Sequence, residues 1–307
     1  MITERGAMPR VFVTGATGFV GREVVRRLAG AGYGVRCLVR PGSAGKLPRG
    51  LGLEAHEGDA ATAETLKGAL NGCDAVIHLV GIIRETPSRG VTFEKLHAQV
   101  TGNLVRAAQD QEVKRFLHMS ANGCRESAAN PYLASKWRAE CAVAESGLAW
   151  TIFRPSVIFG PEDAFVNLLT RLLRLFPVFP VFAKGAYRLA PVAVEDVAAA
   201  FTAALSRPES IGKRFHLCGP TSLSYRELID TIAAAVGRRP PAKIYIPEKI
   251  ARLLALWGEK LPFFPITGIQ LELLLAGNEC PEREWMNVLG IDPQPFAAPA
   301  LSYLQAS

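Results

Sequence analysis

The stretch Gly15-Ala16-Thr17-Gly18-Phe19-Val20-Gly21, entered from the apolar run Val11-Phe12-Val13, decides the fold. The run predicts a strand, the glycines predict a tight turn, and the apolar residues that follow at helical spacing predict a helix. One glycine permits the bend, one lets the backbone approach a phosphate, and one lets the helix pack against the strand. The amides at the helix start then face an anion. The stretch therefore predicts a pyrophosphate site for a dinucleotide, made by Gly15, Thr17, Gly18, Phe19, Val20 and Gly21.

Composition and charge limit the class of protein. The 307 residues are 49% hydrophobic and 21% charged, as in globular proteins. The net charge of +7 suits a phosphate-bearing ligand, an anionic membrane surface or an acidic partner protein. No basic stripe is interleaved with aromatic residues, so we expect no nucleic-acid binding.

The termini and cysteines indicate where the protein works. Met1 to Arg10 is polar and short, and no uncharged apolar run approaches about 18 residues, so we expect neither a signal peptide nor a membrane span. Six scattered cysteines without a Cys-x-x-Cys pair predict buried thiols, with no metal site and no disulfide framework. The expected location is the cytoplasm, with possible attachment to the inner face of the cell membrane.

Strand and helix signals alternate through the first half of the chain, which predicts a doubly wound α/β fold with a parallel sheet. We expect a dinucleotide-binding core over residues 1–160. A mixed segment over 161–307 is expected to contain a core-returning helix at 194–205 and a small substrate-side or partner lobe. Predicted strands in the core are Val11–Thr14, Val35–Val39, Leu53–His56, Ala75–Val80, Phe116–Ser120 and Ala149–Arg154. A predicted helix follows at Tyr132–Ser146. The tail has short predicted strands at Lys213–Cys218 and Lys243–Ile246, and helices at Tyr225–Val236 and from Pro247 through Leu256.

The end of the second predicted strand bears on cofactor choice. NAD-binding folds usually place Asp or Glu there, about 20 residues past the glycines, to bind the ribose 2′-hydroxyl. Here the strand ends in Arg40, whose guanidinium can pair with the 2′-phosphate of NADP. We therefore predict NADP(H), with NAD(H) second; Arg22 and Arg36 are weaker candidates for the phosphate. Asp59, after the third strand, could accept a hydrogen bond from the adenine amino group.

Tyr132 and Lys136 stand four residues apart, on one face of the helix that follows the fifth strand. A tyrosine is a poor acid or base at neutral pH, but a neighbouring lysine cation stabilises its phenolate and can hold the nicotinamide ribose. Ser120, at the end of the fifth strand, could polarise a substrate carbonyl. These three residues are the predicted catalytic set.

Together these motifs resemble the short-chain dehydrogenase/reductase superfamily, in its extended and atypical branches. The Thr14–Gly21 block matches its glycine motif, and Arg154-Pro155 with Ile158-Phe159-Gly160-Pro161 is similar to its Arg-Pro signature. The resemblance implies further cofactor contacts from Ala60, Leu79, Val80, Gly81, Pro155 and Val157.

Within the superfamily, the chain looks most like relatives of the NADPH-binding accessory subunit of respiratory complex I. The stretches that carry this likeness include His118–Gly123, Tyr132–Lys136, Arg154–Asp163 and Gly212–Pro220. The resemblance implies tight NADPH binding in an assembly, without turnover. Similar bacterial chains stand alone and are described as epimerases or dehydratases.

Two departures weaken an ordinary catalytic interpretation. Active extended members have Ser or Thr where this chain has Ala121, and many relatives have Asn at the position of His97. Three functions stay open: an NADP-dependent oxidoreductase or epimerase with a small, apolar substrate; a structural NADPH-holding subunit with a respiratory or membrane-peripheral partner; and a regulator that senses NADP(H). The sequence does not indicate an oligomeric state.

The apolar stretch Leu168–Ala183 contains prolines and two arginines, Arg171 and Arg174. It predicts either a core helix followed by an extended cover strand, or a lid or patch that touches a hydrophobic substrate, a membrane or a partner. Ile266–Leu274 is similarly ambiguous.

Overall fold

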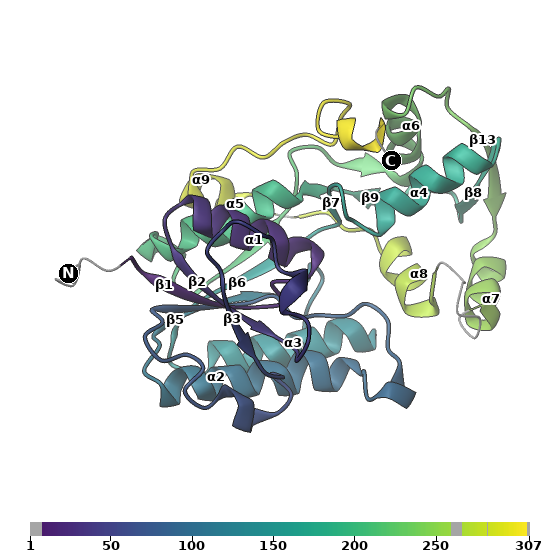
Figure 1. The fold of residues 1–307 in the computed structure, drawn as a ribbon. Coiled ribbons are helices and arrows are strands. Elements are labelled where there is room, and N and C mark those ends of the chain that lie inside the picture. Colours follow the sequence, from purple (N-terminus) through teal and green to yellow (C-terminus); the bar gives the residue numbers. More distant parts are fainter. Residues whose placement is uncertain (1–7, 259–265, 281, 306–307) are drawn as a thin grey trace.

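A seven-stranded parallel sheet forms the centre of the molecule (Figure 1). The computed structural model describes residues 8–258, 266–280 and 282–305. The sheet has the order β11-β6-β5-β4-β1-β2-β3. Its strands are β1 Arg10–Thr14, β2 Gly34–Val39, β3 Glu54–Glu57, β4 Ala75–His78, β5 Arg115–Met119, β6 Ala149–Pro155 and β11 Lys213–Leu217. The predicted doubly wound α/β fold is confirmed.

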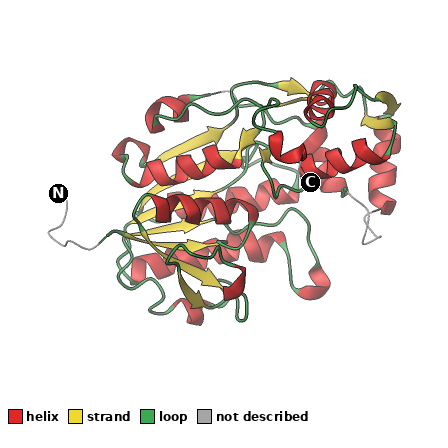
Figure 2. Cartoon of the chain, turned by 45° about the horizontal axis from the view of Figure 1, so that its top comes forward, coloured by secondary structure: helices red, strands yellow, loops and turns green. Residues whose placement is uncertain are grey.

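Helices cover both faces of this sheet, as the red helices around the yellow strands show (Figure 2). On one face α1 (Phe19–Gly30) packs against α5 (Val194–Leu205), with α9 (Glu284–Leu289) beside α5. On the other face lie α2 (Val100–Asp110) and α3 (Pro131–Ala144). A parallel strand buried on both faces has a largely apolar sequence, and this makes the inner strands recognisable, whereas the edge strand β3 is mostly exposed and polar.

The strand and helix limits agree with the predictions to within two residues, and α5 spans the predicted residues 194–205. One placement differs: the segment Lys213–Cys218 was expected in the tail, whereas β11 pairs with β6 and completes the central sheet. The polar stretch Met1–Arg10 lies mostly outside the described residues.

The smaller lobe is built around a two-stranded parallel sheet, β8 (Val178–Phe182) with β13 (Ala242–Ile246). Its helices are α4 (Phe165–Leu175), α6 (Tyr225–Ala235), α7 (Glu248–Gly258) and α8 (Gly268–Leu275). Short strand pairs join it to the core: β7 Ile158–Phe159 with β10 Val192–Ala193, and β9 Arg188–Leu189 with β12 Leu223–Ser224. The stretch Leu168–Ala183 is thus a helix followed by a strand, with Leu169, Leu173, Phe179 and Val181 buried.

The prediction of scattered thiols is wrong for two cysteines. Cys218, just past β11, forms a disulfide with Cys280, 62 residues later. Sequence spacing gave no sign of this pair, because the segment after α8 returns across the carboxyl end of the sheet only in the folded chain. Cys37, Cys73, Cys124 and Cys141 are free.

Candidate functional site

The glycine turn between β1 and α1 has the geometry of an anion site. Gly15 adopts a left-handed conformation with φ of +80°, which other residues rarely adopt. Gly21 must lack a side chain, since a Cβ there would lie 2.0 Å from the Gly15 carbonyl oxygen. Gly18 caps α1 without a side-chain hydrogen bond, and the first turn holds no acidic residue. The amides at the start of α1 therefore remain available to a phosphate.

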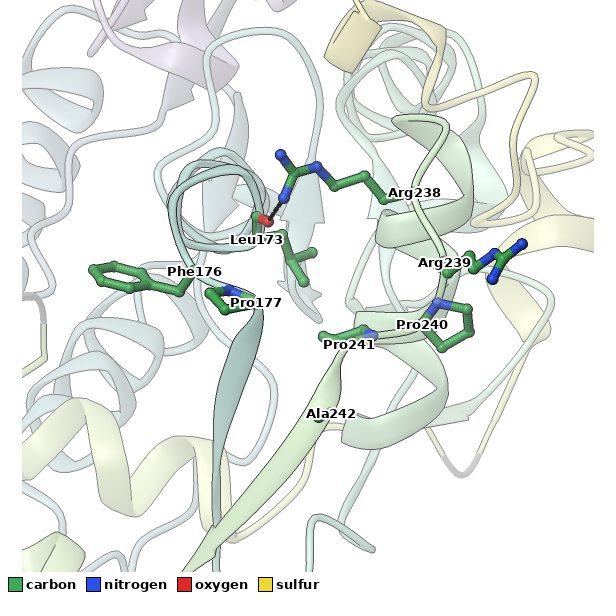
Figure 3. Close-up of a pocket in the computed structure, with 8 residues that line it drawn as sticks. All are labelled: Leu173, Phe176, Pro177, Arg238, Arg239, Pro240, Pro241 and Ala242. Carbon is green, nitrogen blue, oxygen red and sulfur yellow. Dashed lines mark hydrogen bonds between the residues drawn. The ribbon is translucent and has the colours of Figure 1, made fainter.

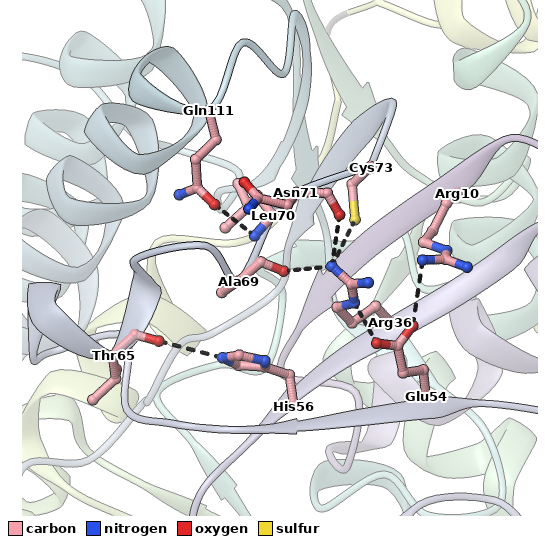
Figure 4. A network of polar contacts seen from close by, with 10 residues as sticks. All are labelled: Arg10, Arg36, Glu54, His56, Thr65, Ala69, Leu70, Asn71, Cys73 and Gln111. Carbon is pink, nitrogen blue, oxygen red and sulfur yellow. Dashed lines mark hydrogen bonds and ion pairs between the residues drawn. The ribbon is translucent and has the colours of Figure 1, made fainter.

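Of the three arginines considered for a 2′-phosphate, two are engaged elsewhere. Arg22 donates to both carboxylate oxygens of Glu162, at 3.0 and 2.8 Å. Arg36 donates to Glu54 at 2.7 Å and to the carbonyls of Ala69 and Asn71, each at 2.9 Å (Figure 4).

Arg40, directly after β2, is different. Its side chain is exposed and makes no hydrogen bond or ion pair with any residue that the structure describes. Arg40 therefore places an exposed cation at the carboxyl end of β2.

The loops after β3 and β4 hold further residues that the sequence predicts to contact a dinucleotide. Asp59 is exposed, and its carboxylate accepts from the Ala61 amide at 2.9 Å. Asn103 of α2 fixes the next residue by donating to the Ala60 carbonyl at 2.9 Å. Leu79 donates its amide to Thr14, and a Cβ on Gly15 would lie 3.1 Å from the Leu79 carbonyl carbon. The segment Leu79-Val80-Gly81 therefore lies against the turn.

Gly81 connects this turn to the predicted catalytic helix. A Cβ on Gly81 would lie 2.9 Å from Lys136 Nζ, so a side chain at this position would displace the ammonium from where it lies. Lys136 is buried and donates to the Met119 carbonyl at 3.0 Å. Burial lowers the pKa of Lys136 to about 8. The ammonium therefore lies against Gly81, and no carboxylate among the described residues pairs with it directly.

Tyr132 lies one turn before Lys136 on α3 and its ring packs edge-on to those of His97 and Phe93, with centroids 5.5 and 5.7 Å away. Burial raises the pKa of Tyr132. No hydrogen bond joins its hydroxyl to Ser120 or Lys136 in the described part of the chain. Ser120 is buried at the end of β5, and its hydroxyl donates to the Cys124 thiol at 3.4 Å.

Sequence reasoning missed Cys124. It lies four residues after Ser120 and is buried, which raises the pKa of its thiol. Only its spacing from Ser120 could have drawn attention to it. The Ser120 hydroxyl, which the sequence predicts to polarise a substrate carbonyl, donates to this thiol instead.

His97 lies in a π-helical turn, Glu94–Gln99, that leads into α2. Its Nε2 accepts from the Ile82 amide at 3.0 Å, so Nδ1 carries the proton and donates to the Ser135 hydroxyl at 2.8 Å. Burial and the nearby Lys136 lower the pKa of His97, which keeps the ring neutral. Both ring nitrogens are satisfied within the protein.

Two further histidines lie beneath this helix layer and were not assigned a role from the sequence. His78 is hydrogen-bonded to the Thr14 and Thr101 hydroxyls at 2.7 and 3.0 Å, and its ring stacks on that of His118 at 5.2 Å. His118 is fully buried, and within residues 8–258, 266–280 and 282–305 neither of its nitrogens has a hydrogen-bond partner. Burial lowers the pKa of both rings.

The Arg-Pro signature is anchored by a buried carboxylate that the sequence did not single out. Glu140 of α3 accepts from Arg154 at 2.8 and 2.6 Å, and from Arg214 at 3.1 Å. This fixes the end of β6, where the Pro155 carbonyl accepts from the Asn122 amide at 3.1 Å. Val157 follows and its carbonyl accepts from the Val192 amide at 2.9 Å.

The segment before Cys280 closes the other side of this sheet edge. The side-chain oxygen of Asn278 accepts a hydrogen bond from the Asn122 amide group at 2.7 Å. Its backbone carbonyl accepts one from the Ser156 hydroxyl at 2.8 Å. Asn122 in turn is hydrogen-bonded to His216 at 2.7 Å. In the described residues, no group of three or more His, Cys, Asp or Glu side chains is arranged to hold a metal ion.

Comparison with known proteins agrees with this geometry. The NAD(P)H-binding family model matches residues 15–208. The accessory subunit named NADH dehydrogenase [ubiquinone] 1 alpha subcomplex subunit 9 is 30% identical in Mus musculus, over 98% of this chain and 80% of that protein. Its counterpart in Arabidopsis thaliana is 31% identical, over 82% of this chain and 64% of that protein.

Two further comparisons concern enzymes. A ceramide reductase of Caulobacter vibrioides is 35% identical over 64% of this chain and 61% of its own length. The solved UDP-glucose 4-epimerase of Thermotoga maritima has the same fold, with a TM-score of 0.74, 21% identity and 97% of each chain covered.

Proposed function

Because the chain belongs to the NAD(P)H-binding family and is homologous to the respiratory accessory subunit, we propose that it binds NADP(H) and transfers hydride to or from a small, apolar carbonyl or hydroxyl substrate. The single observation that carries the proposal is the convergence of the uncapped glycine turn, Arg40 and Lys136 at the carboxyl ends of neighbouring strands.

The residues present fit the dinucleotide. The amides of the turn at Gly15–Gly21 would hold the pyrophosphate, and the free guanidinium of Arg40 would pair with the 2′-phosphate. Asp59 and Ala60 would line the adenine, and Leu79, Val80 and Gly81 the ribose. Lys136 would hold the nicotinamide ribose, beside Pro155 and Val157. When bound, the nicotinamide supplies or accepts the hydride.

The protein's own residues would manage the proton. Tyr132 would give a proton to the substrate oxygen or take one from it, and the Lys136 ammonium would stabilise its phenolate. Ser120 would orient the substrate oxygen once its hydroxyl leaves Cys124. Support for an apolar substrate comes from the ceramide reductase, whose name specifies a lipid.

Arg40→Ala tests the cofactor proposal. A charge-assisted hydrogen bond contributes about 1.5–3 kcal/mol, so the preference for NADPH over NADH should fall about 10- to 100-fold. The two dissociation constants would be measured by fluorescence titration. Arg49→Ala, which removes an exposed arginine from the loop after β2, serves as the matched control. An unchanged preference in Arg40→Ala would refute the role of this residue.

Tyr132→Phe tests the catalytic proposal. It should abolish turnover of an apolar ketone or alcohol while leaving NADPH affinity unchanged, because only the hydroxyl is removed. Tyr245→Phe, on the exposed strand β13, is the control for a tyrosine hydroxyl outside the site. Unchanged turnover in Tyr132→Phe would sink the catalytic assignment.

A second candidate is a structural subunit that holds NADPH within a respiratory assembly. It is favoured by the Ser120–Cys124 hydrogen bond, by Ala121 and by the relatives named as respiratory subunits. The test is purification of the tagged chain from gently solubilised cells, with nucleotide and partners quantified together. Retained NADPH with stoichiometric respiratory subunits would support this candidate; a nucleotide-free, partner-free chain would oppose it.

A further inference from the structure

Helix α7 packs against the rest of the lobe through its small residues. Ala251 and Ala255 are buried in a cluster with Leu271 of α8, and Gly258 is also buried. A surface helix ordinarily buries its large apolar side chains and exposes polar ones. In α7 the small residues face inward, so its large apolar residues must lie elsewhere.

Those large residues form an exposed stripe. Ile250, Leu253, Leu254 and Trp257 recur at helical spacing, and they are between 48% and 65% exposed. Leu256 is exposed beside them, as are Ile244 and Tyr245 on β13, the strand that leads into α7. In the described part of the chain, seven of the twelve exposed large apolar residues thus belong to β13 and α7. A contiguous apolar patch of this kind marks a contact surface.

The charge of the chain is concentrated around the same lobe. Residues 165–188 and 225–258, which contain α4, β8, α6, β13 and α7, hold ten Lys and Arg against three Asp and Glu. The rest of the sequence has 25 of each sign, so these two segments account for the whole net charge of +7. An excess of positive charge in one lobe attracts an anionic partner more than a second copy of the same lobe, although Lys243 and Arg252 are already paired with acidic residues.

Part of this positive charge lines a hollow of about 360 Å³ at the start of β8 and β13 (Figure 3). Arg238 lies there, and its guanidinium donates a hydrogen bond to the Leu173 carbonyl at 2.6 Å. Arg239 follows it in the chain. Phe176, on the opposite wall, is 53% exposed. Apolar and basic groups therefore occur together at both ends of the two-stranded sheet.

We propose that α7, with β13, lies in the interface of an anionic lipid bilayer. The apolar stripe would enter the boundary between headgroups and acyl chains, with Trp257 at headgroup level. Lys249, which follows Glu248 at the start of α7, would extend its ammonium to lipid phosphates. No helix in the described residues is long and apolar enough to cross a bilayer, so the contact is at the surface. The proposal does not depend on hydride transfer, because it concerns another part of the chain.

The test is co-sedimentation of the whole protein with phosphatidylcholine vesicles, with and without added phosphatidylglycerol. We expect binding to the anionic vesicles that weakens as salt is added. The double variant Leu253→Gln/Trp257→Gln should bind at least tenfold more weakly, because each side chain contributes its buried apolar area. Ile211→Gln, at an exposed apolar residue before β11, is the matched control and should bind as the wild type does.

Three results would overturn the proposal. The first is no binding to either vesicle, and the second is equal binding by the double variant and the wild type. The third is a stable wild-type dimer that the double variant turns into a monomer, as measured by light scattering, since a second copy would then cover the stripe. Circular dichroism of both variants checks that α7 is intact, so that weak binding is not simply unfolding.

Discussion

Two regions of the molecule distribute polar and apolar side chains in unusual and opposite ways. These are the α3 side of the central sheet and the outer edge of the smaller lobe. Beneath α3, polar groups are buried: His78, His97, His118, Lys136 and Glu140 are each at most 2% exposed. On α7, apolar groups are exposed, and Ala251 and Ala255 take the inward positions. Both arrangements cost stability in an isolated domain.

The two regions differ in how that cost is offset. Under α3 the partners lie within the protein, since Glu140 binds two arginines and His97 is hydrogen-bonded at both nitrogens. Of these five side chains, His118 alone has no hydrogen-bond partner among the residues that the structure describes. On α7, Ile250, Leu253 and Leu254 stay about half exposed against the residues that the structure describes, and the proposed bilayer would be what covers them. Internal compensation predicts sensitivity to mutation, whereas an external contact predicts tolerance.

The largest effect is expected at Glu140. Glu140→Leu would leave Arg154 and Arg214 without their shared carboxylate, and breaking a buried ion pair costs about 3–5 kcal/mol. Urea unfolding of the variant would measure the loss. Glu94→Leu is the control, because its pair with Arg138 is exposed and should contribute at most about 1 kcal/mol. A similar small loss at Glu140 would mean that the arginines find other compensation.

A smaller loss is expected on the inward face of α7. Ala255→Leu would force a larger side chain against Leu271 and should lower the free energy of unfolding by about 1–3 kcal/mol. Thermal unfolding would report it as a lower Tm. If the variant were as stable as the wild type, α7 would not be packed through its alanines, and the contrast between its two faces would fail.

The sequence predicted the fold well because the inner parallel strands are buried on both faces and the glycine turn has few alternatives. It predicted less well where distant segments meet. The strand Lys213–Leu217 returns to β6 after an excursion through the lobe, and Cys280 reaches Cys218 only because the chain past α8 folds back. Neither pairing leaves a local signature.

The candidate site shows the same division. Gly15–Gly21, Arg40, Tyr132 and Lys136 were identified from local motifs, and their positions on the strand ends and on α3 follow from the order of elements. Cys124, Glu140 and His118 were not identified, because burial and hydrogen bonding depend on packing between elements. Their chemistry is set by the fold and not by their neighbours in sequence.

The pH dependence of stability should reveal the unpartnered histidine. Burial lowers the pKa of His118, so below its ordinary value of 6.5 the unfolded chain binds the proton more readily than the folded one. The free energy of unfolding should therefore fall with decreasing pH, by up to about 1.4 kcal/mol per unit for this group. His118→Leu should reduce this slope without abolishing it, because burial also lowers the pKa of His78 and of His97. Phe116→Leu, two residues earlier on β5, should lower the free energy of unfolding equally at every pH, so the slope with pH should stay the same. Equal slopes in the wild type and His118→Leu would contradict the assignment.

The smallest effect is expected on the outward face of α7, because side chains there do not contribute to the packing of the lobe. Leu254→Gln replaces a half-exposed leucine that the lobe does not bury, so the free energy of unfolding should change by no more than about 0.5 kcal/mol. Urea unfolding in the absence of lipid would measure it alongside Ala255→Leu, its neighbour on the inward face. A loss above 1 kcal/mol would show that Leu254 contributes to packing within the lobe. The stripe would then be part of the protein's own core, and the contrast with the α3 side would disappear.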